Sequence, residues 1–138
     1  MADISVTSTA VQGGKGVSAL AAVIITAGEV VYLDTSGNAN LADNTAALTA
    51  AVAGIALNDA QVNQPVGILK TGILTMNGVL TAGVVYTLSG LANPTTPAPG
   101  TFKPAGDAVS SEFVTVIGVA MSATTLNISI NASGVQKA

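Results

Sequence analysis

The chain contains no cysteine, histidine, tryptophan or arginine. Without cysteine it forms neither a disulfide framework nor a thiolate zinc site. Without histidine it cannot assemble a Ser-His-Asp or Cys-His catalytic arrangement or a histidine-ligated metal site. Any catalytic set would have to be built from Asp, Glu, Lys, Ser and Thr, and no grouping of these residues in the sequence supports one. We therefore expect no enzyme, no catalytic, cofactor-binding or metal-binding residues, and no small-molecule substrate.

Charge is also scarce, because only 8% of the residues are charged, against about 25% in an ordinary soluble domain. Four lysines and seven acidic residues give a net charge of −3. The scattered lysines make no basic patch, which excludes the usual electrostatic basis of nucleic-acid binding. So few charges cannot cover an isolated globule in the usual way. The outer face is either buried against neighbouring subunits or weakly polar, and both alternatives favour a structural role.

No apolar run is long enough to span a membrane. The runs Val17–Ala27 and Ala46–Leu57 each have about a dozen residues, whereas a spanning helix needs about 20. The first run follows Lys15, but its leader carries Asp3 and lacks the positive region of a signal peptide. We expect no membrane contact and a chain that stays in the cytoplasm of the cell that makes it.

What the sequence has in abundance are residues that favour β-strands. Val, Ile and Thr supply 42 of the 138 residues, and 15 glycines interrupt the chain at short intervals. Leu126–Ile130 alternates between apolar and polar residues, which predicts a strand with one buried face. Phe113–Met121 and Val30–Leu33 are apolar throughout, which predicts strands buried on both faces. Val66–Met76 loses its alternation at Gly72, which predicts a bulge or bend there.

The remaining segments favour turns and loops. Ala46–Ala53 is rich in alanine and predicts at most one or two helical turns. Leu91–Gly106 holds four of the five prolines, which predicts an extended loop. Asp34–Asp43 offers oxygen atoms at alternating positions, as a calcium loop does, but its glycine is at the fourth position instead of the sixth. A turn that connects two strands is the favoured interpretation.

Two blocks of sequence recur in the same order. Thr26–Leu33 is echoed further along the chain by Thr81–Leu88, and Val52–Asn58 is echoed by Val116–Ser122. Two matched blocks favour an internal duplication over chance similarity. The repeat also predicts that the two tyrosines occupy equivalent places.

Together these patterns predict an all-β protein, a small β-barrel or sandwich of short antiparallel strands with at most one or two short helices. Residues 1–20, rich in Ser, Thr and Gly, are expected to form an extended N-terminal arm. The β domain is expected to span residues 21–138, in two related lobes of about 21–78 and 79–138, with a Pro-rich loop at 91–106.

Three runs in the first lobe carry a resemblance to a known family. Ala27–Asp34 fits A-G-x-x-V-x-x-D, Ala53–Ala60 contains G-[IV]-A-x-x-D-A, and Pro65–Leu69 follows as the start of a hairpin. In this order they resemble the capsid decoration proteins of tailed bacteriophages, also called head-stabilising or cement proteins. The resemblance covers about residues 25–75, and the second lobe echoes it more weakly. The motifs are short and built from common residues.

The resemblance implies small β-barrel subunits, commonly homotrimers, that bind the major capsid protein on the outside of the virion and clamp neighbouring hexamers. It also implies docking through an N-terminal arm, while the second lobe departs from the shortest members of the family. The apolar residues of the arm and of the Pro-rich loop are therefore the candidate interface residues: Ile4, Val6, Val11, Val17, Leu20, Pro94, Pro97, Pro99 and Phe102.

A structural virion protein that decorates and stabilises the capsid surface is the first hypothesis. The alternatives are another virion component, such as a head-fibre base, a tail-tube or a shell subunit, or a module that binds a host surface. The shortage of aromatic residues, 3% of the chain, argues against sugar binding, which uses aromatic side chains for stacking.

Overall fold

A computed structural model describes residues 15–75, 80–89, 102–104 and 113–136, and this part of the chain is all β. It contains no helix that could cross a membrane. All pairings between its strands are antiparallel, so the predicted fold class is confirmed. The strands are β1 (Lys15–Leu20), β2 (Val30–Leu33), β3 (Ala39–Leu41), β4 (Val52–Ala56), β5 (Pro65–Thr75), β6 (Val85–Leu88), β7 (Phe102–Pro104), β8 (Phe113–Ala120) and β9 (Thr125–Gln136).

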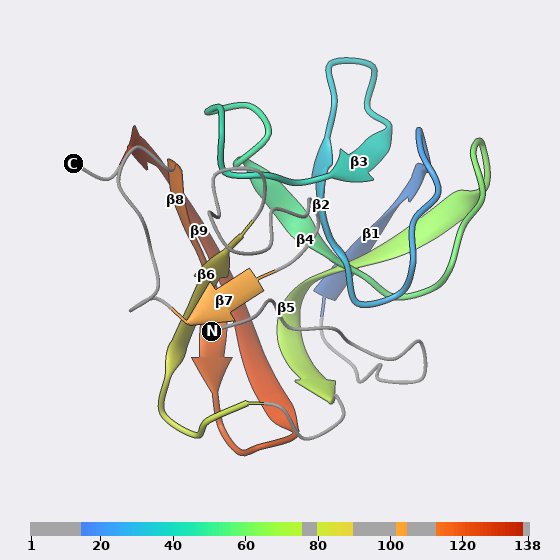
Figure 1. Ribbon diagram of the computed structural model, residues 1–138. Coiled ribbons are helices and arrows are strands. Elements are labelled where there is room, and N and C mark those ends of the chain that lie inside the picture. Colours follow the sequence, from blue (N-terminus) through green and yellow to red (C-terminus); the bar gives the residue numbers. More distant parts are fainter. Residues whose placement is uncertain (1–14, 76–79, 90–101, 105–112, 137–138) are drawn as a thin grey trace.

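The strands form one curled sheet in the order β3-β2-β4-β5-β9-β8-β6-β7, with β1 also paired to β5. In Figure 1 the first half of the sheet, β1 to β4 with the beginning of β5, lies on the right. The second half, the end of β5 with β6 to β9, lies on the left, so that β5 runs from one half into the other. The beginning of β5 pairs with β1 and β4, whereas Thr71–Thr75 pairs with β9. Gly72, with φ of 122°, lies where the partners change. This confirms the predicted bend.

The first half of the sheet closes on itself. β1 pairs with β5, and the next residue, Ala21, forms a bridge with Ala39 at the start of β3. Residues 15–20, which the sequence assigned to an arm, are therefore a strand of this half. The space inside is filled by alanines together with valine and isoleucine side chains, a mixture of small and larger residues that suits the inside of a small curled sheet. The inner cluster of the first half consists of Ala21, Ile25, Val31, Ala39, Ala56, Ala60, Val66 and Ile68.

The two repeated sequence blocks make the same backbone contacts. Gly28 and Gly83 each donate a 2.8 Å hydrogen bond from their N–H to the carbonyl of Ala56 and Ala120, respectively. Val31 lies opposite Gly54 on β4, and Tyr86 lies opposite Gly118 on β8. In both pairs the register shifts at the next residue. The repeat therefore matches Tyr86 with Val31, and the prediction that the tyrosines are equivalent is wrong by one position.

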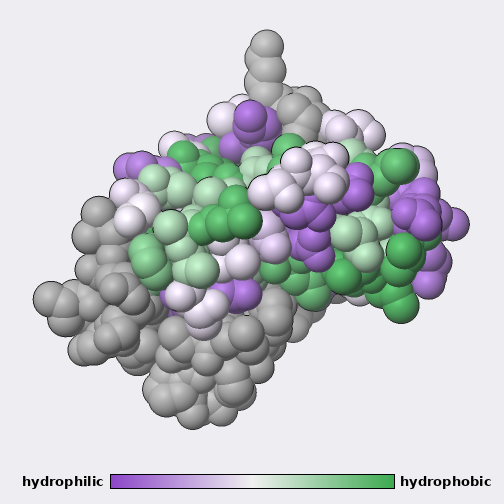
Figure 2. All heavy atoms as spheres, turned by 90° about the horizontal axis from the view of Figure 1, so that it is seen from above, coloured by the Kyte–Doolittle hydropathy of each residue, from purple (hydrophilic) through white to green (hydrophobic). Residues whose placement is uncertain are grey.

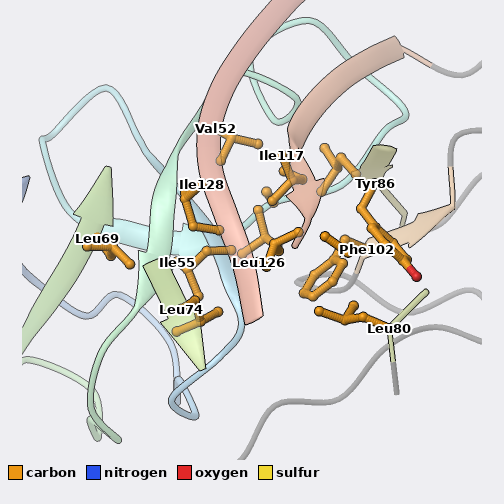
Figure 3. Close-up of a cluster of buried hydrophobic side chains, with 14 of the residues drawn as sticks. Val52, Ile55, Leu69, Leu74, Leu80, Tyr86, Phe102, Ile117, Leu126 and Ile128 are labelled. Atoms are coloured by element: carbon orange, nitrogen blue, oxygen red, sulfur yellow. The ribbon is translucent and has the colours of Figure 1, made fainter. Parts of the chain in front are cut away.

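The main core lies between the two halves and draws on both of them (Figure 3). Tyr86 and Phe102 are fully buried there and meet edge to face, with ring centroids 5.9 Å apart. Phe102 is thus a core residue, and its prediction as an interface residue is wrong. The buried members of the main core are Val30, Ala42, Ala50, Val52, Ile55, Leu69, Leu74, Leu80, Tyr86, Leu88, Phe102, Ile117, Ala120, Leu126 and Ile128.

The burial observed along the strands agrees with the prediction from the alternating segment and disagrees with the predictions from the continuous apolar segments. Leu126 and Ile128 are buried while Asn127 and Ser129 are exposed, which confirms the alternation. The prediction that the two continuous apolar segments are buried on both faces was wrong. Leu33 in β2, Val119 in β8 and Met121 just after β8 are exposed. The sheet is curled around its core, so one face of these strands points outward.

Two glycines allow the paired strands to approach closely, and this generates a prediction. A Cβ atom at Gly118 would overlap the backbone carbonyl oxygen of Asn127, and one at Gly54 would overlap that of Leu69. Backbone cannot move aside as a flexible side chain can. We expect Gly118→Ala to lower the free energy of unfolding by about 1–3 kcal/mol, the usual range for overpacking, as measured by urea denaturation.

Gly67→Ala is the matched control. A Cβ at Gly67 would lie 3.4 Å from Asn58 Oδ1, which is an ordinary contact, so the variant should unfold within about 1 kcal/mol of the wild type. Equal stability of the Gly118 and Gly67 variants would contradict the close approach.

Candidate interaction surface

The structure places three of the nine predicted interface residues. Val17 lies in β1 opposite Ile68 of β5, Leu20 is exposed at the end of β1, and Phe102 is in the main core. The other six lie outside the described residues: Ile4, Val6, Val11, Pro94, Pro97 and Pro99.

Residues 34–38 form the turn between β2 and β3, as the sequence favoured, and the rest of the segment up to Asp43 contains β3. Asp34 Oδ1 accepts hydrogen bonds from the N–H groups of Ser36 (2.9 Å) and Asn38 (3.0 Å), and Oδ2 accepts one from the Asn40 amide (2.9 Å). Gly37 supports the turn with φ of 82°. The carboxylate oxygens that a calcium ion would need are thus bound to the turn itself.

Asp43 organises the alanine-rich segment in the same way. Its Oδ1 accepts hydrogen bonds from the Thr45 N–H (3.0 Å) and from the Thr49 hydroxyl (2.9 Å). The segment forms a single turn, closed by a 3.0 Å bond from the Ala50 N–H to the Ala46 carbonyl. Asp43 thus supplies the side-chain acceptor that holds this turn.

Glu29 and Asp59, far apart in the sequence, meet at the turn before β2. Glu29 Oε1 accepts a 2.7 Å hydrogen bond from the Thr26 N–H, and Asp59 Oδ1 accepts a 2.9 Å bond from the Ala27 N–H. Burial raises the pKa of Glu29, the hydrogen bond from Thr26 opposes this rise, and the negative charge of Asp59 adds to it. No group of three metal-ligating side chains occurs among the described residues.

All four carboxylates in the described part of the chain, those of Glu29, Asp34, Asp43 and Asp59, thus accept backbone N–H groups in turns. Lys103 is buried on β7. Much of the little charge that the chain has is used to shape the fold. The described surface is therefore poorer in free charge than the composition alone indicates.

Several exposed apolar residues lie at one end of the first half. Four apolar side chains there are between 36% and 61% exposed: Leu20, Val23, Ile24 and Val62. We call these four residues the tip patch. In Figure 2 this end, on the right, carries hydrophobic surface beside hydrophilic residues.

Backbone hydrogen bonds hold the two segments of the tip patch together. Ile25 and Ala60 exchange two bonds of 2.9 and 2.8 Å, and the Ala21 N–H donates a 2.8 Å bond to the Gln64 carbonyl. Val23 and Ile24 lie between these contacts on one segment, and Val62 lies between them on the other. Because Ala21 and Ile25 are anchored in the inner cluster, the large side chains between them are held at the surface.

Polar residues border the tip patch. Gln61, Asn63 and Gln64 are exposed, and the Gln61 N–H donates a 2.9 Å hydrogen bond to Gln64 Oε1. An apolar patch with a polar rim on fixed backbone is typical of a surface that binds another protein. Of the four residues, the sequence predicted only Leu20. The run Val17–Ala27 is apolar throughout and gives no sign that Val23 and Ile24 face outward.

No protein-family model matches the chain, and no curated protein sequence matches it. The surface itself is therefore the main basis for proposing a function.

The raised pKa of Glu29 generates a prediction about pH. The folded state holds the proton of Glu29 more tightly than the unfolded state, whose pKa is near 4.5. Stability from this group is therefore full below pH 4.5 and is lost as the pH rises through the higher pKa of the folded state. We expect Glu29→Gln, which keeps the acceptor for Thr26, to remove this loss in urea denaturation between pH 4 and 7.

Asp59→Asn is the control on the same turn. It keeps an acceptor for the Ala27 N–H and removes only the charge beside Glu29. Because burial still raises the pKa of Glu29, the variant should show a smaller loss of stability with rising pH than the wild type, but not none. A larger loss of stability between pH 4 and 7 in Glu29→Gln than in the wild type would contradict the assignment. It would mean that ionised Glu29 stabilises the fold, which requires a lowered pKa.

Proposed function

We propose that this chain is a non-enzymatic structural protein of a virus particle, which binds the outside of a phage capsid and stabilises it. The observation that carries the proposal is the tip patch, where Ile24 and Val62 expose 61% and 51% of their surface on rigid backbone. Large apolar side chains held in water stabilise nothing in the free chain. Covering them with a shell subunit removes apolar area from water, at about 25 cal/mol per Å².

The low charge of the chain supports an assembly role. With 8% charged residues and the described carboxylates engaged in turns, little charge has to be desolvated when the surface is covered. Desolvation of unpaired charge is the main electrostatic cost of such contacts. A surface of this kind suits permanent contact with neighbours.

The place of the resemblance motifs agrees with this role. They supply β2, β4, β5 and the turns around Asp34 and Asp59, which build the half of the molecule that carries the tip patch. The homotrimer that the resemblance implies is an alternative to the two-fold dimer argued below, and sedimentation of the purified chain distinguishes the two.

A second virion role, as a tail-tube or shell subunit that polymerises through its sheet edges, has less support. The edge strands β3 and β7 of the sheet have three residues each. β7 ends with Pro104, which has no N–H to donate to a neighbouring strand. Short edges and proline are devices that prevent pairing between edges.

The test uses particles of the virus that carries this chain, stripped of the protein. Adding wild-type protein should raise the temperature at which the shells burst on heating. Ile24→Lys should weaken binding about 10- to 100-fold, because burial of an isoleucine contributes about 1.5–3 kcal/mol.

Leu48→Lys is the matched control, because Leu48 is 50% exposed but lies on the turn before β4, away from the tip patch. It should stabilise the shells as the wild type does. An unchanged bursting temperature with wild-type protein would reject the proposal, and equal effects of both lysine variants would reject the tip patch as its contact.

A further inference from the structure

A second apolar surface crosses the outside of the second half. Val85 of β6 lies opposite Val119 of β8, Val119 lies opposite Asn127 of β9, and Asn127 lies opposite Ile73 of β5. Residues directly opposite each other in antiparallel strands share one face of the sheet. The four residues therefore form one continuous row across four strands, which we call the outer row.

The outer row is open to solvent. Its three apolar members are 36–40% exposed, and Asn127 is exposed beside them. The row contains no ionisable side chain. Thr71 and Ser129, which are paired and exposed next to it, are also uncharged.

The first half contains an equivalent row of residues, and that row is buried. Through the repeat, Val30, Ile55 and Leu69 correspond to Val85, Val119 and Asn127, and they pair with one another in the same way. All three are at most 1% exposed, because they belong to the main core, beneath apolar side chains of the second half. Figure 3 shows Ile55 beside Leu74, Leu126 and Ile128, with Leu69 to the left of them. Within the described residues, one surface is thus built twice and covered once.

We propose that the outer row is covered by the outer row of a second copy of this chain, related by a two-fold axis. A two-fold contact requires a surface that is complementary to itself. The outer row meets this requirement, because it has no charges to repel their own copies, and its apolar residues face apolar residues. Asn127 fits the same contact, because an amide both donates and accepts hydrogen bonds and can pair with an identical partner.

The size of the outer row sets the strength of this contact. Four side chains that are partly exposed bury far less than the roughly 800 Å² per partner of a standard interface. The free protein should therefore dimerise weakly, with a dissociation constant in the micromolar to millimolar range. On a shell, where many copies are held close together, the same contact becomes effective through the high local concentration.

The inference deepens the proposed function by naming the surface through which neighbouring copies touch. It is tested on the purified chain without any shell, whereas the proposed function is tested on shells through the tip patch. Either can therefore fail without the other.

Sedimentation equilibrium over a range of concentrations is the first test. The wild type should show a monomer–dimer equilibrium, and Val119→Lys should weaken it at least tenfold, because it places a charge against apolar side chains of the other copy. Leu48→Lys, which adds the same charge at a more exposed site elsewhere, should dimerise as the wild type does. A wild type that stays monomeric at millimolar concentration, a trimer in place of the dimer, or equal effects of the two lysines would overturn the inference.

Cross-linking tests the geometry with a variant that preserves the surface. The chain has no cysteine, so Val119→Cys introduces a single thiol. Packed sheets lie about 10 Å apart, so a bismaleimide of about that reach should join two Val119→Cys chains into a dimer. Leu48→Cys should give none, and equal yields from both variants would contradict the two-fold contact.

Discussion

The shared strand β5 determines how the rest of the molecule is arranged. Its first residues complete the sheet of the first half, and after the bend at Gly72 its last residues pair with β9 in the second half. Because one strand belongs to both halves, the second half is fixed against the outside of the first. The main core forms at that junction, and the corresponding outside of the second half has nothing in the described chain to cover it.

This arrangement explains which parts of the fold were predictable from the sequence. Leu126–Ile130 alternates, and a period of two by itself separates the buried face from the exposed one. The turn at Asp34 was predictable for a similar reason, since a short carboxylate followed by Gly37 binds its own backbone. In both cases the information is local.

Continuous apolar segments carry no such information, and there the sequence was misleading. Val30 and Val85 are both valines at equivalent positions of the repeat, but only Val30 is buried, because only the first half has another half packed on it. Phe102 lies within the Pro-rich segment 91–106, which was predicted to be a loop, and was assigned to an interface, yet the ladder of β7 with β6 places its ring against Tyr86. The exposure of Val23, Ile24 and Val62 in the tip patch was not predictable from the sequence for the same reason. Which apolar residues face water depends on tertiary packing.

The exposed apolar surfaces and the scarcity of charge have one physical interpretation. The described acids bind backbone N–H groups in turns, while large apolar residues occupy rigid positions at the surface. A chain with these properties gains stability when other protein surfaces cover it. Electron cryomicroscopy of the virus particle that carries this chain tests that account most directly. The account predicts density for the chain on the outer shell, with the end formed by residues 20–25 and 60–65 against a shell subunit. A chain absent from the particle, or one whose tip patch faces open solvent there, would contradict it.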